Sequence, residues 1–500
     1  MENKEKLLIW LKEFQEKLNA FDLALGTISF DDETVAPSAG ADYRNKAFAL
    51  LAGEIFIYKT SDIAFNNLKK LQSCKLDETT KRIVDIYIKS IEKTKCIPKK
   101  MYVEFVKLQK ESTQIWRKAK KDNNYNLYKP YLLKIIEMTK KIYACRKSKM
   151  PLYDQMLDDF EEGMDMKKYD AFFELLKAKI VPLIKKINSA KKIDDKFLNQ
   201  KFAIDSQKNF NNVLLEYLDF KKENGYMATS SHPFTMELSI GDVRITTRYN
   251  ETQLSENIFS VIHEIGHAFF QQQIDKKFEG TPITCAIGSG MHESQSRLLE
   301  NQIGRSIEFW KPLYKKLQNH FPKQLEKVNL EKFINAINIS IPSFIRTEAD
   351  ELTYSIHIII RYELEKEIFN GKININNLNK VWNEKYKKYL GITPPTDTLG
   401  ILQDIHWSDG SFGYFPAYAL GSAMAAQWIN TMRKKINVNN LLSSGKFIEI
   451  KKWLKNNIHQ YGALYTSIQL LKKVTNEEFN PKYYVDYLIK KFSSLYKIKI

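Results

Sequence analysis

The chain has little cysteine, glycine and proline for its 500 residues, and it has no long apolar run. Its four cysteines, far apart and without a CxxC pair, argue against a disulfide scaffold or a cysteine-based zinc site and predict a reducing compartment, the cytoplasm. Since no window reaches about 18 uninterrupted apolar residues, we expect no membrane span. The charged start, MENKEKLLIWLKEFQEK, lacks the apolar centre of a secretory signal.

Acidic residues are too few to balance the basic ones, with 59 Asp and Glu against 77 Lys and Arg and a net charge of +18. Lysine supplies 66 of those 77, in short runs that acidic, apolar or aromatic residues interrupt along the whole chain. We find no DNA- or RNA-binding motif. The charge therefore indicates a compositional bias of a solvated surface, and we expect no nucleic-acid partner.

Apolar residues are plentiful, at 43%, and aromatic residues make up 12%, enough for a large core. Through the first 220 residues they recur at spacings of three and four, which predicts successive amphipathic helices. The clearest are expected over 4–21, 43–58, 79–95, 101–122 and 131–147. Breaks are predicted at 37–40, Pro98, 121–130 and Pro151.

The pattern changes at SHPFTMELSIGDVRITTRYN, where 234–240 and 243–249 alternate apolar and polar residues around Gly241-Asp242. This predicts a β-hairpin. Helical periodicity returns near Ser255, whose hydroxyl is expected to cap the helix, and then dominates to the C-terminus. We predict a mainly α fold, a single domain over 1–500 in two lobes around a cleft. Its helical N-terminal part is 1–220. The second part, 221–500, contains the small sheet and, beside it, the helix whose motif HEIGH predicts a metal-binding catalytic site.

The stretch VIHEIGHAFF contains two histidines four residues apart, His263 and His267, which a helix places on one face. Zinc accepts imidazole nitrogens and, when catalytic, takes three protein ligands and a water molecule. Glu264 stands beside the first ligand and can serve as general base for that water. Gly266 allows another backbone or a substrate to approach the helix closely. Two satisfied histidines in a core are the alternative interpretation.

The third ligand is predicted in MHESQSRLLEN, where His292 and Glu293 are both candidates. A carboxylate after HExxH is the commoner arrangement in zinc peptidases, but the spacing does not choose between the two. Seven of the eight histidines lie between 232 and 406. Among the eight, only His320 and His459 have no evident partner in the pattern. Six of the eleven arginines also fall there, and a guanidinium can grip a carboxylate with two parallel hydrogen bonds.

HEIGH followed by HESQSR resembles the carboxypeptidase Taq family of metallocarboxypeptidases. Four further motifs in family order are HPF (232–234), IRTEAD (345–350), GILQDIHW (400–407) and FGYFPAYALG (412–421). The stretch 350–365 and FDDETVAPSAGADYR (30–44) also match, with Phe30 where tryptophan is usual. The resemblance spans nearly the whole chain.

This resemblance implies a helical body with a deep active-site groove, similar to neurolysin and angiotensin-converting enzyme, and a homodimer. It implies one Zn²⁺ per chain, with Co²⁺ in some members, bound by His263, His267 and Glu293, so that His292 becomes a supporting or substrate-contacting residue. The implied activity is stepwise release of C-terminal amino acids from peptides with a free C-terminus, with broad specificity except for proline. Glu264 is the expected base.

The substrate residues are predicted from the same motifs. The loop 400–421 offers His406 and Tyr414, with Tyr418 weaker, as donors to the oxyanion. Arg346 with His232 is expected to bind the substrate α-carboxylate, with Gln403 a lesser candidate. Arg346 could instead be a structural ion-pair partner of Asp350, and the tyrosines could be packing in the groove wall.

Arg297 stands four residues after Glu293, where related zinc peptidases usually have an acidic residue. The carboxylate that orients a ligand histidine is therefore unassigned, with Asp350 and Asp404 as candidates. Two rival functions are an endopeptidase or oligopeptidase on the same fold and a catalytically inactive peptide-binding homologue. The complete set of catalytic residue types argues against the latter.

Overall fold

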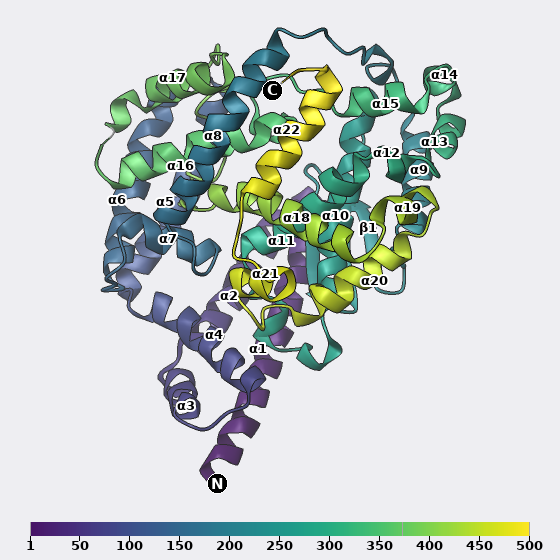
Figure 1. The fold of residues 1–500 in the computed structure, drawn as a ribbon. Helices are drawn as coiled ribbons and strands as arrows, with labels where there is room; N and C mark the ends of the chain where they lie inside the picture. The colour runs from purple at the N-terminus through teal and green to yellow at the C-terminus, as the bar shows by residue number, and fades with distance from the viewer. Residues whose placement is uncertain (1, 373, 500) are drawn as a thin grey trace.

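A computed structural model describes residues 2–372 and 374–499, and helices make up most of it (Figure 1). The five helical segments predicted for the start of the chain are confirmed, and α3 lies between two of them. The first six helices are α1 (Glu2–Thr34), α2 (Ala41–Thr60), α3 (Asp62–Gln72), α4 (Glu78–Lys95), α5 (Lys99–Lys121) and α6 (Tyr125–Ala144).

Side-chain caps explain where several of these helices begin. Ser61, Asp77 and Asn124 each accept a hydrogen bond from a backbone N–H in the first turn of α3, α4 and α6. The Asn124 cap starts α6 within the segment predicted as a break, and Pro130 lies inside the helix. That break is therefore shorter than the sequence predicted.

The rest of the chain is also mainly helical, which confirms the predicted fold class. The longer helices are α7 (Leu152–Phe160), α8 (Met166–Asn188), α9 (Ile204–Tyr217), α10 (Leu254–Gln272), α11 (Ser289–Arg297), α15 (Leu330–Ile337), α16 (Glu351–Phe369), α17 (Leu378–Leu390), α18 (Phe415–Lys435), α20 (Phe447–Asn457), α21 (Ser467–Thr475) and α22 (Lys482–Tyr496). The shorter ones are α12 (Ile307–Trp310), α13 (Tyr314–His320), α14 (Pro322–Leu325) and α19 (Val438–Ser443).

A three-stranded sheet contains the predicted hairpin, β2 (Thr235–Ser239) and β3 (Asp242–Thr247), paired antiparallel. The sequence missed β1 (Gly225–Thr229), which pairs parallel to β3 and gives the order β1-β3-β2. Its short sequence GYMAT begins with glycine and shows no clear alternation of apolar and polar residues. The strand can therefore be identified only from its pairing with β3.

The sheet packs against α10, the helix that contains the HExxH motif. Thr247 Oγ1 lies 3.0 Å from Ser260 Oγ, and Asn257 Nδ2 donates to the same threonine oxygen at 3.0 Å. The helix itself begins at Leu254, and the side chain of its N-cap residue, Gln253, accepts no hydrogen bond from the first turn, so the predicted Ser255 cap is wrong. Hydrogen bonds to β3 anchor this end of the helix instead.

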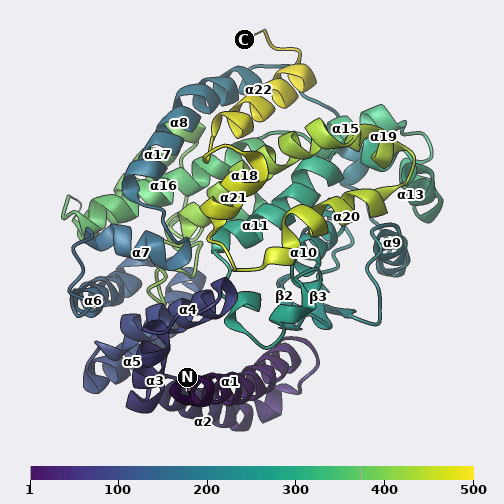
Figure 2. The same cartoon turned by 60° about the horizontal axis from the view of Figure 1, so that its bottom comes forward.

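The apolar core has two clusters. The larger runs from Trp116 to Phe492 and includes the buried faces of α10, α11, α16 and α18. The smaller joins α1, α3 and α4 to Ile274, Phe278 and Ile283. In Figure 2, α1 and α2 lie below β2 and β3. The predicted division at residue 220 and the deep groove stay predictions. Among the described residues, no helix is long and apolar enough to cross a membrane.

Candidate active site

Two helices in direct contact carry the three candidate metal ligands. His263 and His267 lie one turn apart on α10, and Glu293 lies on α11. At Gly266 a Cβ atom would stand 2.6 Å from Ser296 Cα and 2.7 Å from the Gln295 carbonyl oxygen. The absence of a side chain there lets the backbones of the two helices touch, which brings Glu293 to the histidines.

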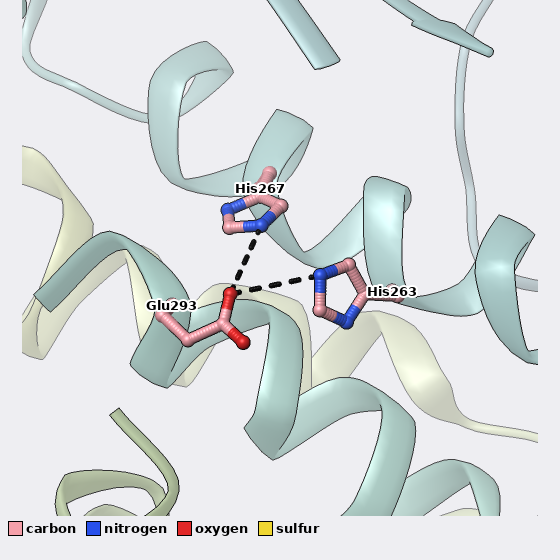
Figure 3. Close-up of side chains that lie close together, drawn as sticks. All are labelled: His263, His267 and Glu293. Atoms are coloured by element: carbon pink, nitrogen blue, oxygen red, sulfur yellow. Dashed lines mark ion pairs between the residues drawn. The ribbon is translucent and has the colours of Figure 1, made fainter. Parts of the chain in front are cut away.

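The ligand atoms converge on one point. Glu293 Oε2 lies 3.6 Å from His263 Nε2 and 3.5 Å from His267 Nε2 (Figure 3). One ligand atom from each residue falls within 4.8 Å of the others. Two imidazole nitrogens and one carboxylate oxygen form the donor set of a catalytic zinc site, so these residues fit such an ion.

Each of the two histidines has its other ring nitrogen engaged behind the site. His263 Nδ1 lies 2.9 Å from Glu300 Oε2, and His267 Nδ1 lies 2.5 Å from His292 Nδ1. His292 Nε2 in turn pairs with Glu237 Oε1 at 2.8 Å. These contacts turn both Nε2 atoms toward Glu293 and place His292 as the partner of a ligand.

The orienting carboxylate of His263 is therefore Glu300, and both sequence candidates for that role were wrong. Asp350 caps α16, where it accepts from the backbone N–H groups of Leu352 and Thr353. Asp404 pairs with Arg346 and Arg361. A usable signal was present, because positions 293, 297 and 300 follow the i, i+4, i+7 spacing of one helix face.

Arg297 compensates the buried carboxylates. Burial alone would raise the pKa of Glu293, but Arg297 and the histidines outweigh burial and hold this pKa well below its usual value. Likewise, against burial, Arg297 and His263 lower the pKa of Glu300 to about 2. Glu300 lies in a π-helical segment, Leu298–Gly304, that continues α11. Both carboxylates are thus charged at neutral pH.

Glu264 is buried on the same helix turn as the ligands and contacts the sheet. Its Oε2 accepts a hydrogen bond from Thr235 Oγ1 at 2.6 Å. Thr235 is the first residue of β2, and no sequence motif indicated its role. The strand therefore fixes the orientation of the predicted general base.

The loop 400–421 brings a histidine and two tyrosines together. The ring of His406 lies 5.4 Å from that of Tyr414, and its Nε2 is 3.4 Å from Tyr418 Oη. Burial lowers the pKa of His406 to about 4, against the opposing charge of Asp404, so the imidazole is neutral at pH 7. Gly421 packs directly on Glu293, because a Cβ there would lie 2.7 Å from its Cβ and Cγ.

Arg346 is buried and already has partners. Its Nε lies 3.0 Å from Asp404 Oδ1, and its Nη1 lies 3.2 Å from Tyr354 Oη. Gln403 Oε1 accepts from the backbone N–H of Arg346 at 2.8 Å and from Arg361 Nη2 at 2.7 Å. The ion-pair partner of Arg346 is thus Asp404 and not Asp350.

His232, in contrast, has an exposed side chain between β1 and β2. Its backbone carbonyl accepts from Ser230 Oγ at 2.6 Å.

Glu365, a buried residue of α16 that no sequence pattern singled out, supports the loop. Glu365 accepts from Tyr153 Oη and Trp407 Nε1 at 2.7 Å each, and from the Gly413 N–H at 2.8 Å. It lies one turn after Arg361, so the helical period places both on the side that faces the loop.

His459 is equally unexpected. It is buried, with Nδ1 2.7 Å from Gln273 Oε1 and Nε2 2.9 Å from Gln295 Oε1. It thereby joins the end of α10 to α11.

The HExxH histidines, a glutamate from the next helix and an adjacent buried glutamate have the donor set and the geometry of a metal-dependent peptide hydrolase site in a helical fold. The chain belongs to the Carboxypeptidase Taq (M32) metallopeptidase family, whose model matches residues 10–492. It is accordingly a metallocarboxypeptidase.

Curated relatives share nearly the full length. The chain is 40% identical over 485 residues to Carboxypeptidase 1 of Bacillus subtilis, covering 96% of this chain and 97% of the relative. It is 33% identical over 502 residues to Thermostable carboxypeptidase 1 of Thermus thermophilus, covering 97% and 98%. Among solved structures, an M32 carboxypeptidase from Deinococcus radiodurans is 30% identical with a TM-score of 0.96, covering 99% and 100%.

Proposed function

We propose that this enzyme removes amino acids one at a time from the free C-termini of peptides, with broad tolerance of side chains except proline. The observation that supports this most directly is the convergence of His263, His267 and Glu293, with Glu264 on the same turn of α10. The proposed ion is Zn²⁺, one per chain, with Co²⁺ as a substitute. A bound Zn²⁺ would polarise the scissile carbonyl and acidify the attacking water.

Glu264 is the proposed general base. Because Thr235 holds its Oε2, its Oε1 is the oxygen that takes the proton of the attacking water. The same oxygen then delivers this proton to the leaving amine. Burial of the side chain keeps bulk water from competing for the proton.

His406 and Tyr414 are the proposed donors to the developing oxyanion, with Tyr418 in support. A neutral imidazole carries one N–H, so His406 can donate a hydrogen bond at pH 7. The tyrosine hydroxyls stay protonated, because burial raises the pKa of both. Preorganised donors of this kind typically contribute about 100-fold or more in rate.

Arg346 and His232 are proposed to bind the substrate α-carboxylate. Arg346 donates to Asp404 through Nε and Nη2, so Nη1, now facing Tyr354, is the donor left for a ligand. Gln403, a lesser candidate, has its amide engaged by protein groups on both sides, which favours a supporting role. The contacts of His292 favour support of His267 over contact with substrate.

A peptide pair tests the exopeptidase function against the endopeptidase alternative. We expect a peptide with a free C-terminus to lose one residue at a time, as mass spectrometry would show, while the same peptide with a C-terminal amide is spared. Equal cleavage of both peptides would contradict the proposal and favour the endopeptidase.

The mechanism, and with it the inactive-homologue alternative, is tested at Glu264. Glu264→Gln should retain the metal and lose at least about 1,000-fold in kcat, because the amide cannot take a proton. Chelation of the parent enzyme should abolish turnover, and added Zn²⁺ should restore it. Unchanged peptide release by the variant would refute the role of Glu264.

We also propose a cytoplasmic homodimer that acts on peptides without a nucleic-acid or membrane partner. All four cysteines are unpaired, in accord with a reducing compartment. α2 has no buried residue and exposes Tyr43, Leu50 and Ile57 at seven-residue spacing, which gives one apolar stripe for a second copy.

A further inference from the structure

Arg297 occupies the position where related zinc peptidases place an acidic residue, and it lies between two carboxylates. Its Nε is 2.6 Å from Glu293 Oε1, and its Nη1 is 3.2 Å from Glu300 Oε2. Its guanidinium carbon lies 4.4 Å from the centroid of the Tyr354 ring, which packs over it. The side chain is 15% exposed, so few water molecules compete for these bonds.

Arg297 joins one candidate ligand, Glu293, to the residue that orients another, His263. Glu293 is a candidate ligand, and Glu300 Oε2 is also the partner of His263 Nδ1 at 2.9 Å. His263 Nε2 in turn faces Glu293 Oε2 at 3.6 Å. Glu293, Arg297, Glu300 and His263 therefore form a closed ring of contacts, which sets the separation of two ligands from different helices.

Within this ring the two oxygens of Glu293 have different tasks. Oε2 points at both histidines, whereas the other oxygen points away from them (Figure 3). That other oxygen, Oε1, accepts from Arg297 through a short, charge-assisted bond. Ser296 Oγ is 3.1 Å from Oε2, but it lies closer, at 2.8 Å, to the backbone oxygen of Glu293.

We propose that Arg297 is a positioning residue that restricts Glu293 to one coordinating oxygen. Coordination through both oxygens would require Oε1 to give up the bond to Arg297 and to rotate away from its present direction. With one oxygen committed, the His₂Glu set supplies three donor atoms and leaves the remaining positions to water and substrate. This inference rests on the metal site of the proposed function.

A simpler role for Arg297 would be to neutralise the buried charge of the two glutamates. The variant Arg297→Lys separates the roles, because lysine keeps the charge but lacks the planar fork that reaches both carboxylates. Arg305→Lys is the matched control. Arg305 also reaches Glu300, with Nη2 3.4 Å from its Oε1, but the bonds of Glu293 do not include it.

The test uses the full chain loaded with Zn²⁺ or Co²⁺. X-ray absorption of the parent enzyme should show one carboxylate oxygen at about 2.0–2.2 Å. In Arg297→Lys we expect the second oxygen of Glu293 to coordinate the metal as well. The visible absorption of bound Co²⁺ should become several-fold weaker, and the dissociation constant of Zn²⁺ should rise at least about 10-fold. Arg305→Lys should match the parent in all three measurements.

Two oxygens of Glu293 on the metal in the parent enzyme would overturn the proposal, and this measurement needs no variant to fold. A well-folded Arg297→Lys protein with parental spectra and affinity would overturn it as well. One-oxygen coordination in a chain that releases no C-terminal amino acid would contradict only the proposed function. An active enzyme with two-oxygen coordination would contradict only the role of Arg297.

Discussion

Glu293 is packed between its own helix, α11, and the helices α10 and α18, and a glycine on each of the latter two leaves room for this packing. Gly266 admits the backbone of α11 against α10, and Gly421 of α18 admits the side chain of Glu293 itself. A methyl group at either position would occupy space that backbone or ligand atoms now fill. The position of the carboxylate thus depends on residues that bind nothing themselves.

Gly421→Ala should weaken metal binding by about 10-fold or more, because its Cβ would stand 2.7 Å from two atoms of Glu293 and displace the ligand. Competition with a coloured chelator measures this change. Gly53→Ala is the control, since a Cβ at this exposed position of α2 meets nothing within 4 Å. The control should leave affinity unchanged. Equal affinities for both variants would contradict the packing argument.

At the scale of elements, two buried carboxylates connect helices to the active site. Glu161 accepts from the N–H groups of Gly290 and Met291 at 2.7 and 3.3 Å, in the first turn of α11. Glu365 on α16 accepts three hydrogen bonds, two of them from the loop that carries His406 and Tyr414. Each carboxylate thus anchors an element that positions site residues.

These two groups predict a pH-dependent stability. Burial raises the pKa of each from 4.5 to about 7. Between pH 4.5 and 7 the unfolded chain releases these protons while the folded protein retains them, so the free energy of unfolding falls as the pH rises. The loss is on the order of 3 kcal/mol per group and is complete above about pH 7.

The double variant Glu161→Gln/Glu365→Gln should flatten this part of the profile in urea unfolding measured from pH 4.5 to 8. Glu449→Gln serves as the control, because Glu449 is an exposed residue of α20 with a 47% exposed side chain. Its profile should follow that of the parent. The same slope in all three proteins would show that neither buried carboxyl group carries a raised pKa.

At the scale of the whole molecule, the exposed apolar stripe of α2 predicts the oligomeric state. The side chains of Leu50 and Ile57 are 69% and 62% exposed in the single chain. Leu50→Glu/Ile57→Glu should convert the proposed dimer to a monomer in sedimentation velocity, because each charge would be buried at the interface. Ile63→Glu, at a 69% exposed position of α3, should leave the dimer intact. If Leu50→Glu/Ile57→Glu stayed dimeric, this face of α2 could not be the dimer interface.

Sequence periodicity determined much of the fold. The N-terminal helices and the β2–β3 hairpin follow from local spacing and turn residues, because such patterns act between neighbours in the chain. β1 escaped prediction because a five-residue strand is defined by its partner. The early start of α6 was not predicted, because the hydrogen bond that Asn124 accepts in the first turn starts the helix within a segment whose residues favour a turn.

The sequence by itself also determined His263, Glu264 and His267 as one chemical unit, since a helix places residues four apart on one face. Only the tertiary structure decided their partners. The contact of α10 with α11 at Gly266 directs Glu293 to the histidines and sets His292 behind His267. Asp404 of the loop pairs with Arg346 and with Arg361 of α16. Glu300, in the segment that continues α11, meets His263 of α10. Local spacing places Glu300 on the helix face of Glu293, but it does not select the partner of each group. That choice depends on how close helices approach and on which buried charges need a partner.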